Sequence, residues 1–215
     1  LLGVEIARHR LQGEVRRLMR AFGAPAATTV LAKSTLPAGE PGHLGVYAGV
    51  LSGSDDVRRQ VEQSDLVVML GTVVTDVNCG AFTADLNLDR LLIAKSGWLG
   101  DGRRRFSPEP PFARFVRRLA AEMKPSSSIA QWPAAPGFDS QGSASSMDRF
   151  MGVIERHLDT NSVVVADTGD SCYGSVFVRT KRDAGYVAPT FYNTMGFAVP
   201  AALGVALADK ATRPI

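Results

Sequence analysis

Apolar, strand-like runs alternate with amphipathic, helix-like runs over residues 1–123. The run at residues 66–70 contains no polar residue, which is typical of a strand that is covered on both faces of a sheet. Such an alternation favours a mostly parallel sheet with helices on both of its faces. The sequence therefore predicts an α/β, Rossmann-like first domain over residues 1–124.

The individual elements follow from hydrophobic periodicity and from capping residues. Residues 7–22 have apolar side chains at helical spacing, and Gly23 is a typical helix stop. Ser54 stands before two acidic residues and is predicted to cap a helix at 55–63. The stretch 33–45 is rich in Pro and Gly and is predicted to be a loop. We further expect the end of a strand at 1–5, strands at 26–31, 66–70 and 90–94, and a helix at 111–123.

A change in composition divides the chain. Residues 125–146 are rich in Pro, Gly and Ser, and we interpret them as a linker. Residues 147–215 are predicted to form the first part of a second α/β domain. The final Pro-Ile pair is typical of the start of a further strand, and residues 1–5 look like the end of one, so both domains are expected to be incomplete. The elements expected in the second domain are a helix at 147–158, a strand at 162–166, a polar turn at 167–171 and a helix at 196–208.

Charge and cysteine usage exclude several classes of function. The formal net charge is +3, from 24 Lys and Arg against 21 Asp and Glu, which is too small an excess to indicate a nucleic-acid partner. Cys79 and Cys172 form neither a metal-ligand spacing nor a disulfide framework, which suits a reduced, cytoplasmic protein. No apolar run approaches the roughly 18 residues that a membrane span needs, so no membrane partner is expected.

Two segments of the second domain carry candidate chemistry. The turn at 167–171 follows a predicted buried strand, and open α/β sheets bind ligands at the carboxyl ends of their strands. Backbone N–H groups and hydroxyls in such a turn can hold phosphate oxygens. The helix that opens at Gly196 carries further small residues, including Gly204, which let a ligand or another backbone approach closely. On these residues alone, an ordinary turn and a tightly packed structural helix remain open as alternatives.

At this spacing, the two segments together resemble the cofactor-binding domain of thiamine-diphosphate-dependent enzymes. That family has a strand that ends in Asp/Glu-x-Gly-x-Ser/Cys, followed by a Met/Ile-Gly-x-x-x-Pro-Ala helix. Residues 167–171 and 195–204 match both motifs in this order. Residues 28–34 and 44–49 resemble a strand with its exit loop and a Gly-x-Tyr-x-Gly stretch of the family's middle domain. Residues 64–83, with their Leu-Gly, Thr-Asp-x-Asn and Phe-Thr elements, resemble the pyruvate, indolepyruvate and phenylpyruvate decarboxylase branch.

The resemblance implies a non-oxidative decarboxylase that depends on thiamine diphosphate and Mg²⁺, acts on a 2-oxo acid and releases an aldehyde and CO₂. Indolepyruvate, phenylpyruvate and pyruvate are the implied substrates, and residues 167–171 with 183–185 favour the first two. The resemblance also implies a homo-oligomer, either a dimer or a tetramer, in which the cofactor lies between domains of two chains.

The same resemblance assigns roles to individual residues. Met195 would be the apolar wedge under the thiazolium ring, which forces the aminopyrimidine toward the reactive carbon. The backbone carbonyl of Asn193 would accept a hydrogen bond from the aminopyrimidine, at a position where relatives usually have Gly. Phe82 and Thr83 would lie on a loop near the active site, and a purely structural role is equally open for them. The residues expected to bind the cofactor are Asp167, Gly169, Asp170, Ser171, Thr194 and Gly196.

The family's metal ligands and its catalytic glutamate are expected outside this sequence. A Gly-Asp-Gly motif with a following Asn would come after Ile215, and the glutamate would lie in a domain before Leu1. We therefore expect no metal ligands among these residues and no turnover by the isolated chain. Two alternatives stay open: an acetolactate-synthase-like enzyme with FAD in its middle domain, and a non-catalytic module for nucleotide binding or oligomerisation.

Overall fold

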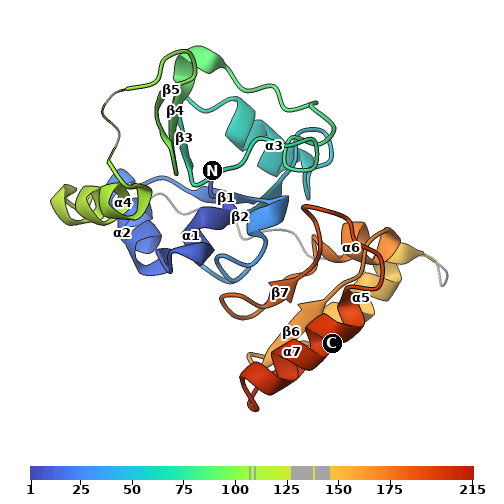
Figure 1. The fold of residues 1–215 in the computed structure, drawn as a ribbon. Helices are drawn as coiled ribbons and strands as arrows, with labels where there is room; N and C mark the ends of the chain where they lie inside the picture. Colours follow the sequence, from blue (N-terminus) through green and yellow to red (C-terminus); the bar gives the residue numbers. More distant parts are fainter. Residues whose placement is uncertain (107, 109, 127–137, 139–145) are drawn as a thin grey trace.

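The computed structural model describes residues 1–106, 108, 110–126, 138 and 146–215. Figure 1 shows two parts of the chain: the first, blue to green, contains β1 to β5, and the second, orange to red, contains β6, β7 and α7. Most of the linker predicted at 125–146 lies outside the described residues. Both parts combine helices with mainly parallel strands, which confirms the predicted α/β class.

The strands of the first part pair in two ladders. β1 (Ala26–Thr29) lies parallel to β2 (His43–Tyr47), and β3 (Val67–Leu70) lies parallel to β4 (Leu91–Lys95). β5 (Trp98–Asp101) pairs antiparallel with β4. Short runs interrupted by glycine give little periodicity, and for this reason β2 and β5 were not predicted as strands.

Residues 1–3 join the two ladders into one sheet. Leu2 bridges in parallel to β1 and to β3. The N–H of Leu2 donates to the carbonyl of Ala27 at 2.8 Å, and the N–H of Gly3 donates to the carbonyl of Leu70 at 2.8 Å. The resulting order is β2-β1-(1–3)-β3-β4-β5, which confirms the mostly parallel sheet. The strand end predicted at 1–5 is confirmed for residues 1–3 and was wrong for residues 4 and 5, where α1 begins.

Helices cover both faces of this sheet. They are α1 (Val4–Arg8), α2 (Gln12–Phe22), α3 (Asp55–Glu62) and α4 (Phe112–Glu122). Side chains alternate between the two faces along a strand, and this alternation decides which helix each residue meets. Leu2 and Leu70 lie in one apolar cluster with α1, α2 and α4, whereas Leu1 and Ala27 lie in another with α3.

Some local predictions hold and others were wrong at the boundaries. The hydroxyl of Ser54 accepts a hydrogen bond from the N–H of Val57 at 3.2 Å, which confirms the predicted helix cap. The helix predicted at 7–22 is two helices, since Arg10 between α1 and α2 adopts a left-handed φ of 53°. The strand predicted at 26–31 is β1 followed by a 3-10 turn, and the loop predicted at 33–45 ends where β2 begins.

The second part is built around β6 (Ser162–Val165), which lies between two short parallel strands. β7 (Tyr186–Val187) pairs with one edge of β6, and β8 (Arg213–Pro214) pairs with the other. β8 confirms the further strand predicted from the Pro-Ile pair. The helices of this part are α5 (Met147–His157), α6 (Asp170–Ser175) and α7 (Ala198–Ala208).

Polar contacts hold the two parts together. The Nζ of Lys33 donates to the carbonyl of Val178 at 2.6 Å, and burial lowers the pKa of Lys33 to about 8 because the ammonium loses hydration. The guanidinium of Arg16 donates to both carboxylate oxygens of Asp183, at 2.8 and 3.1 Å, and to Glu40 at 2.6 Å. The contacts of Arg16 with Asp183 and of Lys33 with Val178 fix the second part against α2 and against residues that follow β1.

Candidate functional site

The carboxylate of Asp167 joins the two segments that the sequence singled out. Its Oδ1 accepts hydrogen bonds from the N–H groups of Thr168 at 2.8 Å and Gly196 at 3.1 Å, and its Oδ2 accepts one from Ala198 at 3.1 Å. The N–H of Ala198, then those of Thr168 and Gly196, hold the pKa of Asp167 below its ordinary value. Residues 167–171 and the start of α7 therefore lie together at the carboxyl end of β6.

Two glycines border open space in this region. Gly169 has φ 82° and ψ −149°, and Gly196 has φ 84°, backbone angles that residues with a Cβ rarely adopt. A Cβ on either glycine would meet no heavy atom within 4 Å. Backbone angle and not crowding therefore requires glycine here, and the space beside both residues is open to a ligand.

α6 begins inside the segment that was predicted to be only a turn, at Asp170. The hydroxyl of Ser171 donates to the carbonyls of Asp167 at 2.9 Å and Thr168 at 3.3 Å, so this side chain already stabilises the turn. The N–H groups of Asp170 and Ser171 have no hydrogen-bond partner within the part of the chain that the structure describes. Free N–H groups at the start of a helix fit the binding of phosphate oxygens.

The residues just before α7 are open to solvent. Met195 is 83% exposed, and Thr194 beside it is also exposed. Asn193 adopts a left-handed φ of 49°, so Asn here takes a conformation that Gly would reach more easily. The Oγ1 of Thr168 donates to its side-chain oxygen at 3.4 Å. An exposed, unbranched Met side chain can pack against a ring that binds beside it.

Phe82 and Thr83 lie on the loop that follows β3. Gly80, Ala81 and Phe82 are three consecutive left-handed residues, with φ values of 54°, 55° and 62°. The Oγ1 of Thr83 accepts a hydrogen bond from the N–H of Val50 at 3.0 Å and donates to the carbonyl of Gly80 at 2.6 Å. Strained backbone of this kind clusters at functional sites. The side chain of Phe82 is 71% exposed, so it is accessible at the surface of the loop.

The structure does not bring this loop to the Asp167 turn. No hydrogen bond or apolar cluster among the described residues joins Phe82 or Thr83 to Asp167. The loop meets α6 across a hollow of about 380 Å³, to which Ala81 contributes from the loop and Tyr173 from the helix. The approach of Phe82 and Thr83 to the active site therefore stays a prediction.

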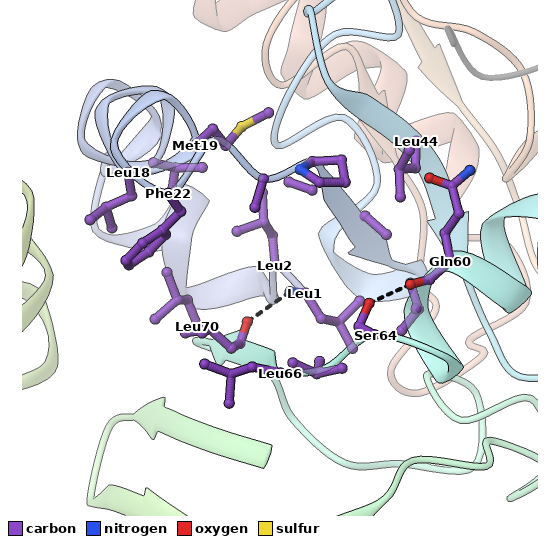
Figure 2. A pocket seen from close by; sticks show the side chains of 18 residues that line it. Leu1, Leu2, Leu18, Met19, Phe22, Leu44, Gln60, Ser64, Leu66 and Leu70 are labelled. Carbon is purple, nitrogen blue, oxygen red and sulfur yellow. Dashed lines mark hydrogen bonds between the residues drawn. The ribbon is translucent and has the colours of Figure 1, made fainter. Parts of the chain in front are cut away.

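A second hollow, of about 360 Å³, lies at the amino ends of β1 and β3 (Figure 2). Its walls are mostly apolar and include Leu2, Phe22 and Leu66. Its two polar side chains are Gln60 and Ser64, and the hydroxyl of Ser64 donates to the carbonyl of Gln60. None of the predicted site residues lines this hollow, so it is not part of the candidate site.

No group of three or more His, Cys, Asp or Glu side chains in the described ranges could hold a metal ion. Both cysteines are free, and Cys172 is buried. No helix within the described ranges is long and apolar enough to cross a membrane.

Two family models match this chain. The central domain of thiamine pyrophosphate enzymes matches residues 1–92, and the C-terminal TPP binding domain of the same enzymes matches residues 167–215. The second match begins at Asp167 and covers the turn, the start of α7 and β8.

Curated relatives carry the assignment further. The chain is 29% identical to the pyruvate decarboxylase of Hanseniaspora uvarum, over 97% of this chain and 38% of the relative. It is 30% identical to the alpha-keto-acid decarboxylase of Mycobacterium leprae (96% and 37%) and 28% identical to the indole-3-pyruvate decarboxylase of Azospirillum brasilense (94% and 37%). The chain belongs to the family of thiamine-diphosphate-dependent 2-oxo acid decarboxylases. It spans about 38% of the length of these relatives.

A solved structure has the same fold. The thiamine diphosphate-dependent 4-hydroxybenzoylformate decarboxylase of Rhodococcus jostii superposes with a TM-score of 0.67 at 20% sequence identity. The superposition covers 99% of this chain and 41% of that structure.

Proposed function

We propose that the protein to which this chain belongs decarboxylates a 2-oxo acid without oxidation and releases an aldehyde and CO₂. The observation that carries the proposal is the open space beside Gly169 and Gly196, which the Asp167 carboxylate holds next to each other. Bound thiamine diphosphate supplies the electron sink that the loss of CO₂ from a 2-oxo acid requires.

The residues present fit that cofactor. The free N–H groups of Asp170 and Ser171 would hold diphosphate oxygens, and the absence of a Cβ at Gly169 lets these oxygens approach the backbone. Met195 would press against the thiazolium ring from its exposed position. The backbone carbonyl of Asn193 would accept a hydrogen bond from the aminopyrimidine and so orient it. The carboxylate of Asp170 would point away from the diphosphate, because two anions repel.

The names of the relatives support a 2-oxo acid substrate, since they include pyruvate, indole-3-pyruvate and alpha-keto-acid decarboxylases. Within that range, residues 167–171 and 183–185 favour indolepyruvate or phenylpyruvate over pyruvate. None of these named relatives is an acetolactate synthase, so the flavin-binding alternative gains no support from them.

The proposal includes Mg²⁺, a homo-oligomer and a cytoplasmic location. One observation bears on the oligomer. α7 is apolar along its whole length, yet none of its residues is buried, and Val199 on it is 80% exposed. An exposed apolar helix of this kind favours coverage by further protein surface, and since the chain spans about 38% of its relatives' length, that surface belongs either to the longer protein or to a partner subunit. The Mg²⁺ requirement and the location follow from the family resemblance and from cysteine usage.

The test uses the product of the complete open reading frame that encodes this chain. Thiamine diphosphate and Mg²⁺ are added, and CO₂ release is measured with indolepyruvate, phenylpyruvate and pyruvate. We expect cofactor-dependent release, and we expect Met195→Ala to lower kcat about tenfold or more because the cofactor loses its orientation. Met147→Ala, which removes a half-exposed Met from α5, is the matched control and leaves kcat unchanged. A protein that binds no thiamine diphosphate, or one that shows flavin absorbance, contradicts the proposal.

A further inference from the structure

α7 begins without a cap of its own. Its N-cap residue is Phe197, whose side chain accepts no hydrogen bond, and no acidic residue stands in its first turn. The first N–H groups of a helix need acceptors, and a carboxylate near them also favours the positive end of the helix dipole. Asp167 supplies that carboxylate from a distant part of the chain, through the bonds from Gly196 and Ala198.

The same carboxylate is unsuited to bind a phosphate. An ionised Asp side chain accepts hydrogen bonds but donates none, so it has nothing to offer to a phosphate oxygen. Its charge repels an anion, and both of its oxygens already accept backbone N–H bonds. Asp167 therefore differs from its neighbours Asp170 and Ser171, whose N–H groups are free.

We propose that Asp167 is a positioning residue, which holds Gly196 and the start of α7 against the Gly169 turn and touches no cofactor. One other hydrogen bond among the described residues connects these segments, the 3.4 Å contact between the Thr168 hydroxyl and the Asn193 side chain. That contact is long, so the carboxylate fixes the distance between the turn and Met195. The inference rests on the proposed function, because it takes this place to be the thiamine diphosphate site.

The geometry predicts the effect of a conservative substitution. Asp167→Asn keeps the size of the side chain but replaces one acceptor oxygen by an NH₂ group, which cannot accept from a backbone N–H. One of the bonds to Gly196 and Ala198 is lost, and the charge is removed from the start of α7. Asp167→Glu keeps the charge and moves it by one methylene, so we expect it to fall between Asn and the wild type.

The experiment measures backbone amide hydrogen exchange in the cofactor-free chain by NMR. In Asp167→Asn we expect the amide that loses its acceptor oxygen, either Gly196 or Ala198, to exchange about tenfold faster, as the loss of a charge-assisted hydrogen bond implies. The amides of Val163 and Val164 in β6 keep their wild-type rates, which shows that the variant is folded. Asp148→Asn, the same change on an exposed Asp of α5, alters none of these rates.

A second readout is the pH dependence of the Gly196 amide shift. It follows the titration of a carboxylate below pH 3.8 in the wild type and is flat in Asp167→Asn. Unchanged exchange at Gly196 and Ala198 in Asp167→Asn, with β6 protected, overturns the positioning role. Calorimetry of the open reading frame product with thiamine diphosphate judges the proposed function separately. If the wild type binds no thiamine diphosphate, the function fails, and the exchange result still decides what Asp167 holds.

Discussion

Two connections in this molecule follow buried parallel strands, and they are held in different ways. The β3 loop (residues 72–84) is joined to residues outside it by the neutral side chains of Asn78 and Thr83. Asn78, only 2% exposed, accepts a bond from the N–H of Leu31 at 3.0 Å and donates to the carbonyl of Val73 at 2.7 Å. The β6 turn (residues 167–171) is joined to α7 by the carboxylate of Asp167.

The two connections differ in how their hydrogen bonds depend on pH. The amide of Asn78 and the hydroxyl of Thr83 do not titrate in the ordinary pH range, so these bonds of the β3 loop do not depend on pH. A carboxylate on a half-exposed turn responds to pH, and the β6 turn has few other bonds to α7. The first connection therefore contributes mainly to the stability of the fold, and the second mainly to the geometry of the site.

The largest expected effect is on the β3 loop. Asn78→Ala removes a buried side chain and leaves the half-buried N–H of Leu31 and carbonyl of Val73 without this partner, and we expect the free energy of unfolding to fall by about 3 kcal/mol. Chemical denaturation followed by circular dichroism measures this change. Asn161→Ala removes an exposed Asn and is expected to change stability by less than about 0.5 kcal/mol. If both variants lowered the free energy of unfolding equally, the bonds of the buried Asn78 side chain would contribute nothing special to the stability of the β3 loop.

In the β6 turn, backbone angle should matter more than packing. Gly169→Ala introduces no clash, since its Cβ meets open space, but it strains a conformation that is nearly restricted to Gly. We expect a loss of about 2 kcal/mol in the free energy of unfolding. Gly13→Ala in α2 also places a Cβ in open space and should instead stabilise by about 0.5–1 kcal/mol. A stabilising Gly169→Ala would show that the turn relaxes to other angles.

A smaller effect is expected at the exposed end of the β3 loop. Thr83→Val keeps the shape of the side chain but loses the bonds to Val50 and Gly80, and we expect stability to fall by about 1 kcal/mol. Thr160→Val, at an exposed position after α5, is the control. If Thr83→Val were as damaging as Asn78→Ala, both would belong to one cooperative network.

The pH response of the β6 turn should be the smallest in global stability, since Asp167 is not buried. Its pKa is lowered in the folded chain, so its stabilising contribution is present above the ordinary value of 3.8 and is lost as pH falls through the lowered pKa. Thermal unfolding between pH 5 and the acid range should therefore depend on pH less in Asp167→Asn than in the wild type. Identical profiles would show that this carboxylate carries no pH dependence.

Local signals predicted the fold better than the site. The cap at Ser54 and the apolar run at 66–70 each specify structure only a few residues away in sequence. Both predictions are confirmed, by α3 and by β3. The break at Arg10 and the strand β2 depend on packing that no short window contains.

For the site, the motifs located the turn and the start of α7. They did not distinguish residues that contact the cofactor from a residue that positions its neighbours. Asp167 and Gly169 belong to one motif and were predicted to bind one cofactor. The bonds of Asp167 to Gly196 and Ala198 span about thirty positions of sequence, so only the folded chain shows them. The sequence predicted this helix from Gly196, so Phe197 is identified as an N-cap residue without an acceptor only in the folded chain.

The place of residues 1–3 in the sheet has a consequence for association. Without this segment, β1 and β3 would face each other with unpaired backbone groups on both sides. Such edges recruit strands from other molecules, which is a common route to domain swapping and aggregation. Because the gap is one strand wide and flanked by parallel neighbours, a short peptide with the sequence of this segment could fill it in trans.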